Sequence, residues 1–400
     1  MSFAINNNLL IVGNFSPNTG YAWDTIVEYF CALGEMFLKK GNRALVCYPE
    51  ADIIPEKFKT AGVEVILFDF FKAGLIDVYR LIRKYRIRTL YLTDRPAFSS
   101  KYLMCRLAGV RKIVIHDRTS GERDTPNHFK RWIKTIINHY PVMSADIAIG
   151  ISEYVRQRLI RVSCFPEERT VKIWNGVNID KFAPGDDDYV YRHYAIPGGK
   201  KIVFANSRAN KYKGIQTLIE AAEILIHEKK RDDLFFLYCG DGPDIGYFRS
   251  LIAEKDLNKF FLCPGKTGEI DRILKGVSIV VVPSIWQEGF GLSIVEGMAS
   301  ERVVVASRVG GIVEIIRDGE NGYLFPAGDS EELSSQLSRV LDDEYLREKT
   351  GRHARSTVIS SFNIEDKKKE LVNLFENICF SVSSADNSEV LPGRRLKAGK

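Results

Sequence analysis

The amino-acid sequence predicts an α/β protein built from two doubly wound domains, each a mostly parallel sheet with helices on both faces. The chain has 400 residues, which exceeds the size at which one hydrophobic core stops growing and favours two domains of roughly 180 to 200 residues. Apolar runs of strand length alternate with helical periodicities, as in parallel sheets. This alternation stops at Pro184-Gly-Asp-Asp-Asp188, a linker by composition, and then starts again.

The first half opens with a strand, a loop and a helix. Leu9–Val12 predicts the first strand, and residues 13–20 form a turn-rich loop. The next helix starts near residue 23 or 24 and ends before Gly41, a common helix-ending residue. Further strands are predicted at 44–48, 63–68, 89–92, 112–116, 146–150 and 171–174, with helices near 72–86, 99–108, 128–142 and 152–161.

The second half repeats this alternation and ends in helices. Strands are predicted at 201–206, 234–239, 260–263, 278–282 and 302–306, with helices near 214–229, 244–256, 268–276 and 292–300. The last amphipathic helix carries Phe362, Leu371 and Phe375, and the polar segment after it has the composition of a disordered tail. The predicted units are therefore residues 1–184, 185–360, 361–380 and 381–400.

Composition limits the class of protein. The chain is 45% apolar and 27% charged, as expected for a globular protein. We see no apolar run approaching the ~18 residues of a membrane span, and Met1–Asn8 lacks the order of a secretory signal. We therefore expect a cytoplasmic chain. Its seven cysteines are scattered without a Cys-x-x-Cys pair, which favours reduced core residues over disulfides or metal ligands.

Positive charge is concentrated in the first half. Residues 1–180 hold 26 Lys and Arg against 18 Asp and Glu, whereas residues 181–400 hold 31 against 33. The imbalance is sharpest between Arg80 and Lys134, with 15 basic and four acidic residues. Such a surface favours an acidic partner: a phospholipid surface, a lipid-pyrophosphate acceptor or nucleic acid.

The main candidate site is the segment Glu288-Gly-Phe-Gly-Leu-Ser-Ile-Val-Glu296. The apolar run 278–282 ends at Pro283 directly before it, so the segment lies at the carboxyl end of a predicted strand. Ligands bind at this edge in open α/β sheets. Taken alone, the pattern also fits a plain strand-to-helix turn with a solvated Glu296.

The residue types of this segment suit a sugar nucleotide. Gly289 and Gly291 would let the backbone approach a ligand, and the helix starting at about Leu292 would aim free N–H groups at a phosphate. Carboxylates beside an anion site are useful if they accept hydrogen bonds from sugar or ribose hydroxyls. Glu288 and Glu296 would then bind those hydroxyls.

Two cations follow the first strand of the second half. Arg208 and Lys213 would both point into the crevice, where Arg can grip phosphate oxygens bidentately and Lys can add a point charge. Gly240-Asp-Gly-Pro243 forms a turn after the next strand. Each feature alone fits a surface residue or an ordinary turn. Three such turns at successive strand ends of one sheet together predict a diphosphate site.

These motifs resemble the retaining glycosyltransferases of family 4, two-domain GT-B enzymes of the glycosyl transferases group 1. The strongest match is the Glu-x7-Glu pattern of Glu288 and Glu296. The supporting matches are Ser207-Arg208, Lys213-Gly214, Gly240–Pro243, Ser307–Gly311 with Glu314, Ser152–Tyr154, Asn175–Val177 and the helix around Phe362. The resemblance covers nearly the whole chain. It implies two Rossmann-like domains facing a central cleft, with the last helix crossing back to the first domain.

The resemblance also implies roles in the donor site. The C-terminal domain would bind the nucleotide-sugar donor and the N-terminal domain the acceptor. Arg208 and Lys213 would bind the diphosphate, Glu296 the ribose and Glu288 the donor sugar. The remaining implied donor-site residues are Gly240, Gly289, Phe290, Gly291 and Leu292.

Two further implied residues lie in the first domain. His116, at the end of a predicted strand, corresponds to a family histidine that supports the transition state near the donor sugar. The first loop departs from many relatives, which carry adjacent glycines there, because this chain has Asn18-Thr-Gly-Tyr21 with one glycine at the tip. Gly20 remains a predicted donor contact.

The segment His128–Tyr140 predicts an amphipathic helix. One stripe carries the apolar residues Phe129, Trp132, Ile133, Ile136, Ile137 and Tyr140, with Lys130, Arg131 and Lys134 opposite. This pattern fits a helix on a membrane surface and equally one packed on a sheet. Because the segment lies between two core strands, we expect it to pack on the sheet. The basic surplus nevertheless favours peripheral contact with an anionic membrane.

We therefore expect a metal-independent, retaining glycosyltransferase that needs no cofactor and binds no nucleic acid. It would move a sugar from a UDP- or GDP-sugar to a glycan or lipid-linked acceptor, in cell-surface polysaccharide or glycolipid synthesis. The catalytic residues would be His116, Arg208, Lys213 and Glu288, with the cations stabilising the leaving diphosphate.

Two other functions stay open: a sugar-nucleotide epimerase or hydrolase of the same fold, and a non-catalytic sugar-nucleotide-binding protein. The first strand-to-helix turn lacks Gly-x-Gly-x-x-Gly, which argues against a NAD-dependent dehydrogenase.

Overall fold

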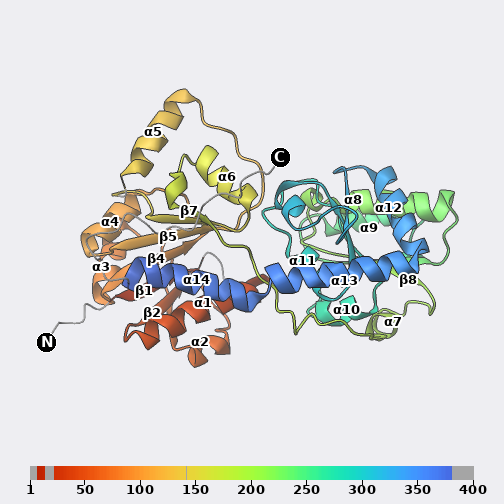
Figure 1. Ribbon diagram of the computed structural model, residues 1–400, viewed down its shortest axis with the longest axis horizontal. Helices are drawn as coiled ribbons and strands as arrows, with labels where there is room; N and C mark the ends of the chain where they lie inside the picture. Colours follow the sequence, from red (N-terminus) through yellow and green to blue (C-terminus); the bar gives the residue numbers. More distant parts are fainter. Residues whose placement is uncertain (1–6, 14–21, 141, 381–400) are drawn as a thin grey trace, which may run out of the picture.

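The computed structural model describes residues 7–13, 22–140 and 142–380 and arranges them as two α/β domains (Figure 1). Each domain is built around one parallel sheet. The predicted tail, residues 381–400, lies outside the described residues, as does Gly20.

The N-terminal domain contains seven parallel strands among its described residues, in the order β3-β2-β1-β4-β5-β6-β7. The strands are β1 (Asn8–Val12), β2 (Ala44–Tyr48), β3 (Val63–Leu67), β4 (Ile87–Thr93), β5 (Lys112–Asp117), β6 (Ile147–Gly150) and β7 (Thr170–Lys172). The helices are α1 (Ala22–Lys39), α2 (Glu56–Thr60), α3 (Leu75–Lys84), α4 (Ser100–Ala108), α5 (His128–His139) and α6 (Glu153–Arg161).

The two faces of this sheet carry separate hydrophobic cores. Leu9 and Ile11 of β1 belong to the core beneath α1, whereas Leu10 and Val12 belong to the core beneath α3 and α4. Strand residues alternate between faces, so burial on both sides explains why β1 is apolar throughout. The doubly wound prediction is confirmed.

The C-terminal domain contains six parallel strands within residues 201–325, in the order β10-β9-β8-β11-β12-β13. The strands are β8 (Lys201–Asn206), β9 (Leu234–Cys239), β10 (Phe261–Gly265), β11 (Ile279–Val282), β12 (Val303–Ser307) and β13 (Tyr323–Phe325). The helices of this half of the chain are α7 (Tyr189–His193), α8 (Ile215–Glu223), α9 (Ile245–Glu254), α10 (Ile270–Gly276), α11 (Leu292–Ala299), α12 (Ser330–Asp342), α13 (Glu344–Ser361) and α14 (Ile364–Phe380).

The last helix returns to the first domain, as the resemblance implied. α13 and α14 run one after the other along both domains in Figure 1. At their junction the amide of Val177 donates to the carbonyl of Phe362 over 2.8 Å, and that of Ile364 donates to the carbonyl of Val177 over 3.0 Å. Leu371 and Phe375 of α14 are fully buried in the core that α1 covers.

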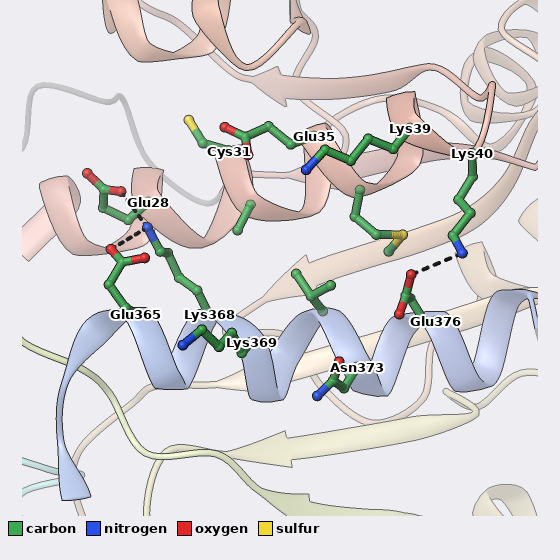
Figure 2. Close-up of a pocket in the computed structure, with 13 residues that line it drawn as sticks. Glu28, Cys31, Glu35, Lys39, Lys40, Glu365, Lys368, Lys369, Asn373 and Glu376 are labelled. Carbon is green, nitrogen blue, oxygen red and sulfur yellow. Dashed lines mark hydrogen bonds and ion pairs between the residues drawn. The ribbon is translucent and has the colours of Figure 1, made fainter. Parts of the chain in front are cut away.

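A surface groove follows the seam between α1 and α14 (Figure 2). Several of its charges are paired: Lys368 lies 2.7 Å from Glu365 and 3.3 Å from Glu28, and Lys40 lies 3.1 Å from Glu376. The candidate site residues do not line this groove. We therefore interpret it as a packing seam between two helices.

The expected packing of α5 on the sheet is wrong. Phe129, Trp132 and Tyr140 are exposed, and the side chain buried on α5 is instead that of Asn138. Asn138 donates from Nδ2 to the carbonyl of Ser163 over 2.8 Å and accepts from Ser144 over 2.8 Å. The hydrogen-bonded side-chain amide of Asn138 therefore faces the domain, and the apolar stripe faces outward.

In the part of the chain that the structure describes, no helix combines the length and the apolar character needed to cross a bilayer.

Candidate functional site

The candidate donor-site loops follow three neighbouring strands. β9, β8 and β11 lie side by side in the sheet, so the turns that carry Gly240, Arg208 and Glu288 meet at one edge. A Cβ at Gly214 would lie 1.8 Å from the carbonyl oxygen of Pro283. With φ at +68°, this position requires glycine, which lets the turn carrying Lys213 approach the end of β11.

Glu288 is the centre of a hydrogen-bonded cluster. Its Oε1 accepts from Lys213 Nζ over 2.5 Å and from Ser284 Oγ over 2.6 Å, and its Oε2 accepts from Ser120 Oγ over 3.1 Å. Burial alone would raise the pKa of Glu288, but the Lys213 charge and these hydrogen bonds outweigh it and hold the pKa below its ordinary value. Glu288 is therefore an anion at neutral pH.

The N-terminal domain contributes directly to this cluster through the loop 119–121. The amide of Gly289 donates to Ser120 Oγ over 3.0 Å, and that of Gly121 donates to the carbonyl of Gln287 over 2.6 Å. A Cβ at Gly289 would lie 2.9 Å from the carbonyl oxygen of Thr119. Ser120 was not among the predicted site residues, although it joins the two domains at the carboxylate.

Glu296 lies on α11, whose N-cap Gly291 has φ at +109°. It is 4% exposed, and its Oε2 has no hydrogen-bond partner among the described residues. Burial raises the pKa of Glu296 to about 8, against the opposing effects of the Lys181 charge and a hydrogen bond with Asn206. A buried polar atom without a partner costs free energy. A ligand hydroxyl would remove that cost.

Arg208 is exposed after β8, and within the described residues its guanidinium has no ion pair. Gly240 is buried, and its amide already donates to the carbonyl of Gly265 over 3.0 Å. A Cβ at Gly240 would lie 2.1 Å from the carbonyl oxygen of Ser207. Gly240 therefore has a packing role, whereas the Arg208 head group is available to an anion.

The side chains of Phe290 and Leu292 face the core of the C-terminal domain. Phe290 is 2% exposed and packs edge-to-face on Phe362, with 5.6 Å between ring centroids. Leu292 is half-buried against the same core. Of Phe290, only the backbone is therefore placed to contact a ligand.

His116 is the second-to-last residue of β5 and is buried. Its Nδ1 lies 2.6 Å from Tyr91 Oη and 3.2 Å from Arg118 Nη2. Because a guanidinium can only donate, Nδ1 accepts and the ring proton resides on Nε2. Burial, followed by the Arg118 charge, holds the pKa of His116 well below its ordinary value. The ring is neutral, and its Nε2–H has no partner among the described residues.

Asp94 is a second titratable group beside His116 that sequence reasoning missed. It follows β4 with φ at +56° and accepts from the Arg118 amide over 2.7 Å, while its own amide donates to the His116 carbonyl over 2.9 Å. Burial raises the pKa of Asp94 to about 6. A polar residue directly after a strand run was the available signal.

Glu314 connects two motifs that the sequence presented separately. Its Oε2 accepts from the Glu153 amide over 2.8 Å, and its Oε1 accepts from the Tyr154 amide over 2.7 Å. These amides are the first of α6, whose N-cap is Ser152. A carboxylate of the C-terminal domain therefore occupies the positive end of an N-terminal-domain helix.

We expect Glu314→Ala to loosen the contact between the domains. The change removes two charge-assisted hydrogen bonds at a helix end, a loss of about 1 kcal/mol. Small-angle X-ray scattering should give a larger radius of gyration than for the wild type. Glu314→Gln, which keeps an acceptor oxygen, should fall between the two, and the surface variant Glu348→Ala should match the wild type. Identical scattering from all four proteins would contradict this role.

The comparisons with known proteins agree with this architecture. A glycosyltransferase from Rickettsia africae superposes with a TM-score of 0.78 over 94% of this chain and 100% of that one, at 21% identity. The Anabaena protein HepE, solved in complex with UDP and glucose, gives a TM-score of 0.73 over 92% of this chain and 99% of that one, at 19% identity. The fold is therefore that of a GT-B protein.

Sequence comparisons give a more specific similarity. Residues 191–357 match the model described as glycosyl transferases group 1, so this part of the chain is similar to that family. D-inositol 3-phosphate glycosyltransferase of Corynebacterium efficiens is 30% identical over 58% of this chain and 56% of that protein. Poly(ribitol-phosphate) α-N-acetylglucosaminyltransferase of Staphylococcus aureus is 29% identical over 72% of this chain and 55% of that protein. The matches thus span little more than half of these relatives.

The structure brings some of the predicted site residues together and does not describe one of them. The structure brings Lys213 and Glu288 into contact, and it places Arg208 and Glu296 on loops and helices of the same sheet edge. Gly20 lies outside the described residues. The individual roles, and the narrower assignment to family 4, stay predictions.

Proposed function

We propose that this protein is a retaining glycosyltransferase that takes a sugar from a nucleotide-diphosphate sugar. The observation that carries the proposal is the cluster around Glu288. A charged, buried carboxylate lies at the carboxyl edge of the C-terminal sheet, with a cation on one side and a serine of the opposite domain on the other. Such a site can hold a sugar hydroxyl between the domains.

The donor would lie across the ends of β8 and β11. Arg208 and Lys213 would bind the diphosphate, and the free Oε2 of Glu296 would accept from a ribose hydroxyl. Glu288 would exchange its bond with Lys213 for donor-sugar hydroxyls, which frees the ammonium group for the phosphate. HepE was solved with UDP and glucose, which favours a UDP-sugar over other donors.

Bond cleavage would be driven by charge stabilisation. As the sugar–phosphate bond breaks, negative charge develops on the leaving diphosphate, where preorganised cations lower the barrier most. Lys and Arg side chains supply the compensating positive charge, so we propose that no metal ion or other cofactor is needed. The acceptor hydroxyl would attack from the face that the diphosphate leaves, giving its proton to the leaving phosphate. The neutral Nε2–H of His116 would donate to the donor sugar.

The acceptor would be an anionic glycan or lipid-linked compound held by the N-terminal domain. The basic surplus of that domain suits such a compound. The names of two relatives contain a phosphate-bearing compound, D-inositol 3-phosphate and poly(ribitol phosphate). We propose the synthesis of a cell-surface polysaccharide or glycolipid, at the cytoplasmic face of an anionic membrane.

Nucleotide binding is the direct test of the donor site. UDP, GDP and ADP are compared by thermal shift, and one of them should raise the melting temperature, since ligand at 100 times its Kd adds about 2.7 kcal/mol to the free energy of unfolding. Arg208→Ala should remove most of the shift, because an exposed side chain is lost from the diphosphate site. Arg352→Ala, an exposed arginine on α13, is the matched control.

The result also separates the alternatives. If no nucleotide shifts the melting temperature, the donor site is assigned wrongly. If nucleotide binds and the sugar is released or epimerised without an acceptor, the hydrolase or epimerase function holds instead. Binding with no turnover of any sugar nucleotide would indicate a non-catalytic binding protein.

A further inference from the structure

α5 presents an apolar stripe to solvent. Phe129, Trp132 and Tyr140 are 68%, 62% and 64% exposed, and Ile136 is 41% exposed. The spacing of three and four residues places Phe129, Trp132 and Ile136 on one helical face, and Tyr140 directly follows the helix. The rings of Phe129 and Trp132 stack, with 6.4 Å between centroids. Single exposed apolar side chains are ordinary, but a contiguous row of large ones marks an interaction surface.

The opposite face of α5 fixes this orientation. Besides the buried Asn138, Lys134 donates from Nζ to the carbonyl of Val162 over 3.0 Å. Asn127 caps the helix by accepting from the Lys130 amide over 2.9 Å. The bonds of Asn138 and Lys134 to residues 163 and 162 therefore hold α5 on the domain, and rotating the helix to bury its stripe would break them.

The charges around the stripe favour an anionic occupant. Residues 125–145 contain Lys130, Arg131 and Lys134 and no Asp or Glu. Lys130 and Arg131, which lie between Phe129 and Trp132 in the sequence, are both exposed. A twofold-symmetric contact between two copies would bring two such basic helices together, at an electrostatic cost. A bilayer with anionic lipids instead offers an apolar layer beneath a negative surface.

We propose that α5 docks on the surface of a bilayer that contains anionic phospholipid. Phe129, Trp132 and Ile136 enter the boundary between head groups and acyl chains, while Lys130 and Arg131 lie at the lipid phosphates. α5 projects from the top of the N-terminal domain in Figure 1. This inference rests on the membrane part of the proposed function and names the surface that performs it.

The position of α5 in the chain gives membrane docking a functional reason. The segment 118–127 connects the end of β5, which carries His116, to the start of α5, and it includes Ser120 of the Glu288 cluster. Docking through α5 would therefore hold the acceptor side of the site at a fixed position near the membrane. A lipid-linked acceptor would reach the site without leaving the bilayer.

Vesicle flotation tests the surface, with phosphatidylcholine vesicles compared with vesicles that also contain phosphatidylglycerol. The wild type should bind the anionic vesicles only, and more weakly as salt is raised. Lys130→Gln with Arg131→Gln should weaken binding about 30-fold at low salt, from about fivefold per charge. Phe129→Ser with Trp132→Ser should weaken it at least about tenfold. Tyr345→Ser, which removes a 71% exposed aromatic from the other domain, should bind as the wild type does.

Tryptophan fluorescence gives an independent reading. Trp132 should shift to the blue on anionic vesicles, and Trp132→Phe should lose that shift while still binding. Equal binding to both vesicle types, or unchanged binding by the Phe129/Trp132 variant, would overturn the proposal. So would a dimer in solution that this variant abolishes, because a second copy would then be the occupant.

Nucleotide thermal shift on the same variants keeps the two proposals separate. The substituted side chains are exposed and distant in sequence from the donor loops, so the shift should be unchanged. Loss of vesicle binding with a normal nucleotide response supports the surface. If the wild type itself binds nucleotide normally but binds no vesicles, the surface proposal is overturned and the donor site still stands.

Discussion

Lys213→Ala is expected to lower kcat/KM for sugar transfer by about 100- to 1,000-fold, the range for losing one preorganised charge partner of a transition state. The ammonium group lies 2.5 Å from Glu288 at the edge where the diphosphate would leave. Its loss also leaves the buried Glu288 charge unpaired, which destabilises the fold and raises the pKa of Glu288. Steady-state kinetics and thermal unfolding measure the two effects separately.

A double variant distinguishes chemistry from folding. Lys213→Ala with Glu288→Gln removes both charges, so the melting temperature should return toward the wild-type value while activity stays low. Lys213→Arg keeps the charge and should remain folded with partial activity. If the double variant regains transfer activity, Lys213 serves only to neutralise Glu288, and its assigned role at the diphosphate is wrong.

Glu296→Gln is expected to stabilise the protein at pH 8 and to weaken nucleotide binding. The pKa of Glu296 is about 8 in the folded chain, against a reference value of 4.5. Between pH 4.5 and about 8 the folded chain therefore binds a proton that the unfolded chain has lost. The free energy of unfolding falls as pH rises through this range. Glutamine has no carboxyl proton to lose, so the variant should lack this contribution.

The same group links pH to ligand affinity. An ionised carboxylate accepts from ribose hydroxyls more strongly than a carboxylic acid does. Nucleotide should therefore bind the wild type more tightly as pH approaches about 8, while the variant should bind weakly with a flatter pH profile. Calorimetry across this range measures both. Parallel stability and affinity profiles for the two proteins would show that Glu296 neither titrates there nor contacts nucleotide.

The sequence was informative where one physical pattern repeats locally. Strands buried on both faces appear as apolar runs, which is why the strand carrying Val280 and the turn after it were located correctly. The glycines and carboxylates of that turn follow within nine residues. The position of Glu288 at the end of a strand could therefore be predicted without long-range information.

Contacts between distant segments were not predictable in this way. Ser120 lies 168 residues from its partner Glu288, and Glu314 lies 160 residues from Tyr154. No spacing rule connects such residues. α5 shows a second limit: helical periodicity reveals which side chains share a face but not which face is buried. A single polar side chain, Asn138, decided that question through hydrogen bonds to loop carbonyls.

The return of α14 to the first domain sets an order of events during synthesis. Leu371 and Phe375 complete the core against α1, yet the ribosome makes them after every strand of the C-terminal sheet. The N-terminal domain therefore stays incomplete, with the apolar face of α1 uncovered, while the C-terminal domain can already fold. The domain made first is the one completed last.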